Sequence, residues 1–139
     1  MQAEVSLDTS HAIALVVPSD QLHPKAVALS KQMELSRVRL VTTRGVLLEI
    51  GNALSKRRFR ASGANVLSWL EADPAIEIVP LSTDLYAKAF DLYRNRPDKD
   101  WGLVDCASFV VMEERGITEA LTADEHFEQA GFRALLRGI

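Results

Sequence analysis

The stretch Asp100-Trp101-Gly102-Leu103-Val104-Asp105-Cys106-Ala107-Ser108-Phe109-Val110-Val111-Met112 places carboxylates at the start of a helix that is too apolar to face water on most sides. An anion is stabilised near a helix N-terminus, because unpaired backbone N–H groups and the helix macrodipole both favour negative charge there. That preference explains an isolated aspartate. Three more acids, Asp8, Glu49 and Asp124, fall at the ends or flanks of other predicted elements. The pattern raises the question of whether these carboxylates meet Asp105.

The chain as a whole is typical of one globular domain, spanning residues 1–139. Its 139 residues are 47% hydrophobic and 25% charged, which is enough apolar material for a core without crosslinks. No apolar run approaches the ~20 residues of a membrane helix. No basic segment followed by an apolar one opens the chain, so we expect neither a membrane span nor a secretory signal. The single cysteine, Cys106, cannot form an internal disulfide, and a cytoplasmic location is therefore expected.

The charges are segregated along a chain whose net charge is -3. Residues 37–60 contain seven basic side chains and one acid, whereas residues 84–128 contain eleven acids and five bases. A basic surface beside an acidic pocket suits a polyanionic substrate whose reacting phosphate is bridged by cations. Solvated helix faces explain most of these charges equally well when each is taken singly.

Short apolar runs alternate with helical patterns throughout the chain. Strands are expected near residues 3–7, 38–41, 76–79, 119–122 and 132–135. Helices are expected near residues 11–17, 21–35, 43–56, 61–72, 83–94 and 101–115. This alternation predicts an α/β fold with a parallel sheet covered on both faces. Asp8 and Asp124 each follow a strand, so neighbouring strands would bring them to one crevice, while Glu49 borders the apolar stripe of its helix.

Four clustered carboxylates would repel one another and favour protonation unless cations offset their charge. Oxygen-rich sites suit Mg²⁺ or Mn²⁺, and the natural reaction of such a site is metal-assisted phosphodiester hydrolysis. Three of the acids also have a simpler interpretation, and Glu49 is the hardest to explain in this way. Asp8 and Asp124 could cap local turns, and Asp105 could simply benefit from a helix N-terminus.

Four segments resemble, in order and spacing, the acidic motifs of the PIN-domain nucleases, and the last two are similar to the VapC toxin branch in particular. They are Leu7-Asp8-Thr9-Ser10, Leu48-Glu49-Ile50-Gly51-Asn52-Ala53-Leu54, Trp101 through Phe109, and Leu121-Thr122-Ala123-Asp124-Glu125-His126-Phe127. The resemblance implies a three-layer α/β/α fold with a central, mainly parallel sheet of four to five short strands. It implies a Mg²⁺- or Mn²⁺-dependent endoribonuclease, a VapB-like antitoxin partner and a homodimer. The alternatives are a PIN-like module that binds RNA or protein without catalysis, and a PIN nuclease that processes RNA without an antitoxin.

By this resemblance, the catalytic and metal-binding acids would be Asp8, Glu49, Asp105 and Asp124. Thr9, Asn52 and Thr122 match supporting positions. Asp100 matches an acid that some members carry, and it would be either an outer ligand or a helix cap. We expect the basic residues that follow the second motif to hold the RNA backbone; they are Lys56, Arg57, Arg58 and Arg60. His126 is expected to lie at the surface or in local packing, because metal-activated hydrolysis needs no histidine base.

Overall fold

The computed structural model describes residues 3–138, so Met1, Gln2 and Ile139 of the predicted domain lie outside the described residues. The strands are β1 (Glu4–Leu7), β2 (Arg39–Thr43), β3 (Ile76–Val79), β4 (Glu119–Leu121) and β5 (Arg133–Ala134). The helices are α1 (Thr9–Val16), α2 (His23–Leu35), α3 (Arg44–Ala53), α4 (Arg57–Ala72), α5 (Thr83–Asn95), α6 (Leu103–Arg115) and α7 (Glu125–Gln129). None of these helices is long and apolar enough to cross a membrane.

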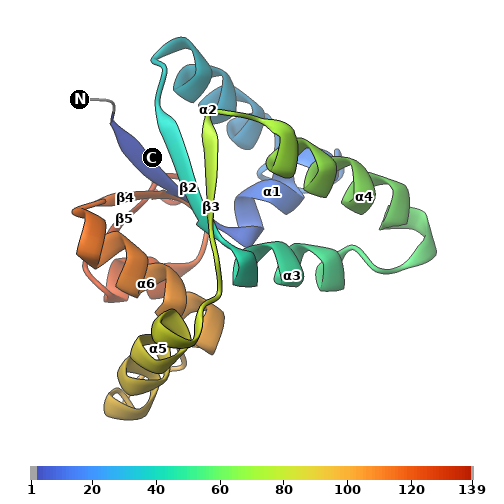
Figure 1. Cartoon of the computed structure of the whole chain (residues 1–139). Helices are drawn as coiled ribbons and strands as arrows, with labels where there is room; N and C mark the ends of the chain where they lie inside the picture. The colour runs from blue at the N-terminus through green and yellow to red at the C-terminus, as the bar shows by residue number, and fades with distance from the viewer. Residues whose placement is uncertain (1–2, 139) are drawn as a thin grey trace.

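The strands form one parallel sheet in the order β3-β2-β1-β4-β5 (Figure 1). The chain leaves β1 toward β2 and β3 on one side, and later returns to β4 and β5 on the other. The strand order therefore reverses between β1 and β4, where open α/β sheets place their ligands beyond the carboxyl ends of the strands. The predicted α/β/α fold with a central parallel sheet is confirmed.

Two apolar layers pack on opposite faces of the sheet. Helices α1 to α4 cover one face, with Leu7 and Leu40 of the sheet among their buried partners. Helices α5 to α7 cover the other, against Val41 and Ala120 (Figure 1). Alternate residues of a strand point to opposite faces, so Leu40 and its neighbour Val41 serve different layers. The apolar faces near residues 12–35 and 61–70 pack in the first layer.

Several helix starts differ from those expected. Helix α4 begins at Arg57, four residues before the predicted start, so the basic segment forms its first turn. Helix α1 has Asp8 as its N-cap, and no side chain bonds to the helix there. The N-cap of α6 is Gly102, so a capping role for Asp100 is wrong. The three N-caps, Lys56, Asp8 and Gly102, are of different residue types, so residue preference alone places such helix ends imprecisely.

The polar alternation in β1 has a structural explanation. Glu4 begins the strand at the amino end of the sheet, where Arg115 donates hydrogen bonds to it and to Glu77 of β3. The three residues that follow Glu4 are buried, including the polar Ser6. The strand is therefore central despite its charged first residue.

Candidate active site

Asp8 lies directly after β1 and is 5% exposed. The Thr122 hydroxyl donates a hydrogen bond of 2.7 Å to its carboxylate, and the Ser10 hydroxyl donates a longer one of 3.3 Å. Burial raises the pKa of Asp8 to about 6, with smaller upward contributions from the charges of Asp105 and Glu49, while the bond from Thr122 acts the other way. The aspartate is thus kept in an environment that disfavours its ionised form unless a cation joins it.

Glu49 is half-buried on α3, and its charge acts on the Asp8 carboxyl group. Thr43 caps this helix by accepting the Val46 N–H, which fixes where the helix leaves β2. The Thr9 hydroxyl donates a 2.8 Å hydrogen bond to the Glu49 carboxylate. Burial raises the pKa of Glu49, and the negative charges of Asp105 and Asp124 add to the shift.

Asp105 occupies the first turn of α6. The Gly102 N–H donates to its carboxylate at 3.3 Å, and the Nδ1 atom of His126 lies 3.0 Å from the same oxygen. Burial raises the pKa of Asp105, as does the charge of Asp124, whereas the hydrogen bond with His126 lowers it. The apolar body of α6 is packed in the core and holds this first turn in place.

Asp124 is the N-cap of α7, and its carboxylate accepts the His126 N–H at 2.9 Å. Its own N–H donates to the Thr122 hydroxyl at 3.0 Å. The Nδ1 atom of His126 lies 3.4 Å from Asp124 Oδ1. Burial lowers the pKa of His126, but the hydrogen bond with Asp105 and the charges of the surrounding acids outweigh it and raise the pKa.

The four predicted acids therefore come together from segments far apart in the sequence. Each of Asp8, Glu49 and Asp105 has its pKa raised by burial and by the charge of at least one other member. One ligand atom each from Asp105, Asp124 and His126 lies within 4.8 Å of the other two. A hard divalent cation fits this donor set, because it prefers oxygen ligands and would offset the repulsion that raises these pKa values.

The supporting residues divide into two groups. Thr9 and Thr122 are part of the site through their hydrogen bonds to Glu49 and Asp8. Asn52 is exposed on α3, one turn after Glu49. Asp100 is also exposed, in the loop before α6. The structure thus brings neither Asn52 nor Asp100 into the hydrogen-bonded cluster.

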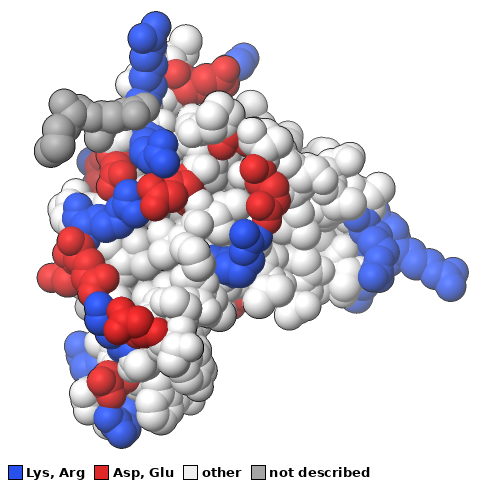
Figure 2. All heavy atoms as spheres, viewed as in Figure 1, with Lys and Arg blue, Asp and Glu red and all other residues white. Residues whose placement is uncertain are grey.

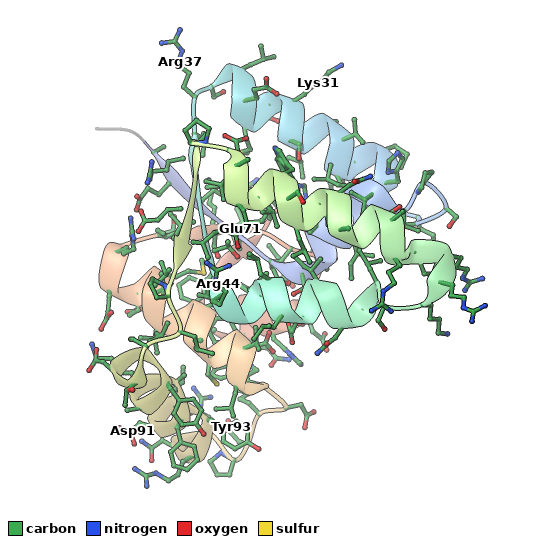
Figure 3. The ribbon with its side chains drawn as sticks, turned by 45° about the vertical axis from the view of Figure 1, so that its right-hand side comes forward. Lys31, Arg37, Arg44, Glu71, Asp91 and Tyr93 are labelled. Atoms are coloured by element: carbon green, nitrogen blue, oxygen red, sulfur yellow. The ribbon has the colours of Figure 1, made fainter. Side chains whose placement is uncertain are left out.

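The basic segment lies at the turn between α3 and α4. Lys56, Arg57, Arg58 and Arg60 are all exposed there. Figure 2 shows basic side chains gathered at this end of the molecule. At the other end of these two helices, Arg44 of α3 forms an ion pair with Glu71 of α4 (Figure 3). We call the helices α3 and α4 together the arm. The ion pair joins them at one end, and the exposed basic residues lie at the other end, its tip.

The sequence interpretation missed the contributions of Ser10 and His126. The Ser10 hydroxyl accepts the Ala123 N–H at 2.9 Å while it contacts Asp8, which links the ends of β1 and β4. His126 was expected at the surface or in local packing with no role in the site, yet its ring contacts two of the acids. The available signal was its position two residues after an N-cap aspartate, which turns its backbone toward that carboxylate.

Comparison with known proteins agrees with this geometry. The family model described as PIN domain matches residues 5–133. This chain belongs to the PIN-domain family. The family that the four motifs predicted is therefore confirmed.

Two similar proteins are the "23S rRNA-specific endonuclease VapC20" of two Mycobacterium tuberculosis strains, each 27% identical over 128 residues, or 92% of this chain and 95% of the relative. The crystal structure of M. tuberculosis VapC20, described as a Sarcin-Ricin loop cleaving toxin, superposes with a TM-score of 0.80 at 25% identity, covering 92% of this chain and 95% of that one. FitAcB from Neisseria gonorrhoeae has a TM-score of 0.62 at 18% identity, covering 94% of both chains, and supports the fold alone. The predicted resemblance to the VapC branch is confirmed.

Proposed function

We propose that this PIN-domain protein is a Mg²⁺- or Mn²⁺-dependent endoribonuclease and the toxin of a VapC-type toxin–antitoxin pair. The observation that carries the proposal is the convergence of Asp8, Glu49, Asp105 and Asp124 at the switch point of the sheet, with raised pKa values for three of them. Buried carboxylates that disfavour their own ionisation need a function to explain them, and metal binding provides one.

The chain's own hydroxyl groups would orient the carboxylates of the site. Thr122 and Ser10 orient the Asp8 carboxylate, and Thr9 orients Glu49, so the oxygens are held before an ion arrives. When bound, the divalent ion would activate water and stabilise charge on the phosphate in an in-line displacement. The half-buried position of Asp105 and Glu49 leaves that side of the site accessible to a phosphodiester.

The substrate we propose is structured RNA. The similar VapC20 protein is named for 23S rRNA, which makes this RNA the first to test with the present chain. The exposed basic turn between α3 and α4 would bind the sugar-phosphate backbone through charge. Asn52, which precedes that turn on α3, would contact the RNA near the scissile phosphate, and the exposed Asp100 would serve as an outer ligand at most.

We also propose that a VapB-like antitoxin binds this protein, that the protein acts on RNA in the cytoplasm, and that it forms a homodimer. One surface suits self-association: Tyr86, Phe90 and Tyr93 of α5 are exposed in a row, with ring centroids 6.3 and 6.4 Å apart. Figure 3 shows this helix, with Tyr93 labelled, at the lower end of the molecule and away from the arm of α3 and α4. A second copy of the same apolar row would cover it.

Cleavage of purified 23S rRNA with and without Mg²⁺ or Mn²⁺ tests the proposal. We expect cleavage at discrete positions, its loss with a chelator, and a fall of at least about 100-fold in Asp8→Asn and Asp105→Asn. Asp91→Asn is the matched control, because Asp91 is an exposed acid that pairs with Arg94 on α5. Retained cleavage in both site variants would refute the metal-site assignment. RNA binding without cleavage by the wild-type protein would favour the non-catalytic alternative.

A further inference from the structure

We propose that His126 is a direct metal ligand through Nδ1, and that it makes the site prefer Mn²⁺ and similar transition metals to Mg²⁺. The inference rests on the proposed metal-dependent function and adds a nitrogen donor to a site otherwise made of carboxylates. It concerns the half of the site formed by α6 and α7. The three atoms involved are Asp105 Oδ2, Asp124 Oδ1 and His126 Nδ1.

The first observation is the spacing of these atoms. His126 Nδ1 lies 3.0 Å from the Asp105 oxygen and 3.4 Å from the Asp124 oxygen. Neighbouring ligands of an octahedral ion, each about 2.1 Å from the metal, are about 3.0 Å apart. An ion that contacts both aspartate oxygens would therefore also have Nδ1 within coordinating distance after small adjustments.

The second observation separates this half of the site from the other. Hydroxyl groups already orient Asp8 and Glu49, through Thr122, Ser10 and Thr9. An imidazole nitrogen takes the corresponding place between Asp105 and Asp124. A hydroxyl beside a metal-bound carboxylate can remain a hydrogen-bond donor, but an imidazole N–H cannot point at a cation. A ring that coordinates the ion must therefore present the Nδ1 lone pair, whereas a ring that keeps its N–H there stays bonded to Asp105 outside the coordination sphere.

The third observation is that hydrogen bonding and packing fix the backbone that carries the ring. The His126 N–H is bonded to Asp124 Oδ1, which fixes the backbone at the start of α7. The next residue, Phe127, is fully buried and packs edge-on against Phe109 of α6, with centroids 4.9 Å apart. Asp105 is one turn before Phe109 on that helix. The same packing therefore sets the positions of His126 and Asp105 together.

The chemical consequence is metal selectivity. Imidazole is a good ligand for Mn²⁺ and later transition metals, whereas Mg²⁺ favours oxygen donors and retains its waters. Removing the ring should therefore weaken Mn²⁺ binding more than Mg²⁺ binding. His126→Gln keeps a polar side chain of similar reach and removes the nitrogen lone pair.

Pulsed electron paramagnetic resonance on the Mn²⁺-loaded protein tests the inference directly. The chain contains three histidines, so protein labelled with ¹⁵N-histidine reports on His11, His23 and His126 alone. His11 is fully buried against Ser30, and His23 bonds the Ala14 carbonyl. We expect a ¹⁵N coupling of a directly bound imidazole in the wild type and in the control His23→Gln, and its loss in His126→Gln. We also expect Mn²⁺ affinity to fall at least about tenfold in His126→Gln, and Mg²⁺ affinity by less than about threefold.

The outcomes distinguish this inference from the proposed function. Bound Mn²⁺ without histidine coupling in the wild type, or a coupling that persists in His126→Gln, would overturn the role of His126 and leave the carboxylate site standing. Equal losses of Mn²⁺ and Mg²⁺ affinity would indicate a purely structural role and would also overturn it. Absence of Mn²⁺ binding to the wild-type protein would overturn the proposed function together with this inference.

Discussion

The carboxyl group of Asp8 shows how a single residue links stability to function in this protein. It is buried and bonded to Thr122, and its pKa is about 6 in the fold against an ordinary value of 3.8. The folded metal-free protein therefore binds a proton at Asp8 more tightly than the unfolded chain does. This group's contribution is most favourable below pH 3.8 and is lost as the pH rises through 6.

Replacement of Asp8 by Asn should accordingly stabilise the metal-free protein above pH 6. We expect a gain on the order of 1–2 kcal/mol at pH 8, since the variant removes a buried charge and keeps a hydrogen-bond acceptor for Thr122. Urea unfolding between pH 5.5 and 8 with a chelator measures it. Mn²⁺ should stabilise the wild type and not the variant. A variant that is less stable than the wild type at pH 8 would contradict this account of Asp8.

Thr122 links two of the acids, because its hydroxyl donates to Asp8 and accepts the Asp124 N–H. Thr122→Val keeps the side-chain shape and removes both bonds, so we expect a loss of about 1–3 kcal/mol in stability. Mn²⁺ affinity should fall with it, as measured by calorimetry. Thr122→Ser, which retains the hydroxyl, is the control and should bind Mn²⁺ nearly as well as the wild type. Equal behaviour of the two variants would show that the hydroxyl has no part in the site.

At the residue scale, the four acids could be named from the sequence, and Thr9 and Thr122 could be named as supporting residues through the motif resemblance, but the bonds that join them could not be predicted. An acid beyond a strand end or on the border of an apolar stripe is visible in the sequence. The contacts of the Thr122 hydroxyl with Ser10 and with Asp8 join residues more than 110 positions apart. They depend on the register that pairs Leu7 with Leu121, which no local pattern specifies.

At the scale of elements, the arm made of α3 and α4 carries the proposed RNA contacts. The basic residues at its tip would bind RNA without a defined pose, because they attract phosphates by charge alone. The acidic site, by contrast, needs one phosphate in a defined position. Helix α4 extends to Arg57 where the pattern indicated a loop, since exposed arginines are good helix formers and lack the apolar period that marks a buried helix. For this reason the helix was expected to start at residue 61, whereas α4 starts at Arg57.

Neutralising Arg57 and Arg58 by Gln should weaken RNA binding across sequences. The loss of two phosphate contacts should reduce the slope of log affinity against log salt by about 1.4 for single-stranded segments. Fluorescence anisotropy over a range of salt concentrations measures this slope. Lys31→Gln with Arg133→Gln is the matched control, because both residues are exposed and lie on α2 and β5. An unchanged slope in the arm variant would assign Arg57 and Arg58 to solvent.

The exposed row on α5 should govern self-association. Phe90→Glu places a charge between Tyr86 and Tyr93 and should shift the protein toward monomer, with at least a tenfold weaker dimer. Light scattering over a concentration series measures the mass. Leu35→Glu is the control, because Leu35 is the most exposed large apolar side chain in the described residues, at 83%, and lies on α2. A monomeric wild type, or a dimer that persists in Phe90→Glu, would remove α5 as the interface.

At the scale of the whole molecule, the two ends of the sheet have opposite electrostatic designs. The carboxyl end gathers acids whose ionisation is disfavoured. At the amino end, Arg115 of α6 donates hydrogen bonds to Glu4 of β1 and to Glu77 of β3. These bonds join three segments of the chain. The hydrogen bonds from Arg115, with Arg39 adding to them, lower the pKa of Glu77 to about 2 from 4.5. This end stabilises the fold, while the other supports function at some expense in stability.

The Arg115 cluster should control acid stability. Because the pKa of Glu77 is lowered in the fold, its contribution is complete above pH 4.5 and is lost as the pH falls toward 2. Arg115→Gln should therefore be less stable than the wild type at pH 7, and the difference should shrink as the pH falls below 4.5. Urea unfolding at each pH measures it, with Arg133→Gln as the exposed control. A constant difference across this range would contradict the linkage.

The fold class was predictable because five short strands alternate with helices, and that pattern permits few architectures. The strand order does not follow from the alternation, since several windings of the chain satisfy the same pattern. That order decides the site: only because β4 lies beside β1 can Thr122 bond both the Asp8 carboxylate and the Asp124 N–H. The periodicity left open whether the four acids lie together, and the resemblance to the PIN-domain motifs supplied that grouping.

The central claim is that Asp8, Glu49, Asp105 and Asp124 hold a divalent cation together. Anomalous diffraction from crystals soaked in Mn²⁺ tests it most directly. We expect a peak within about 2.5 Å of oxygens from at least three of these acids, and no such peak in Asp8→Asn crystals. Wild-type crystals without a peak at this end of the sheet, under Mn²⁺ concentrations that support RNA cleavage, would contradict it.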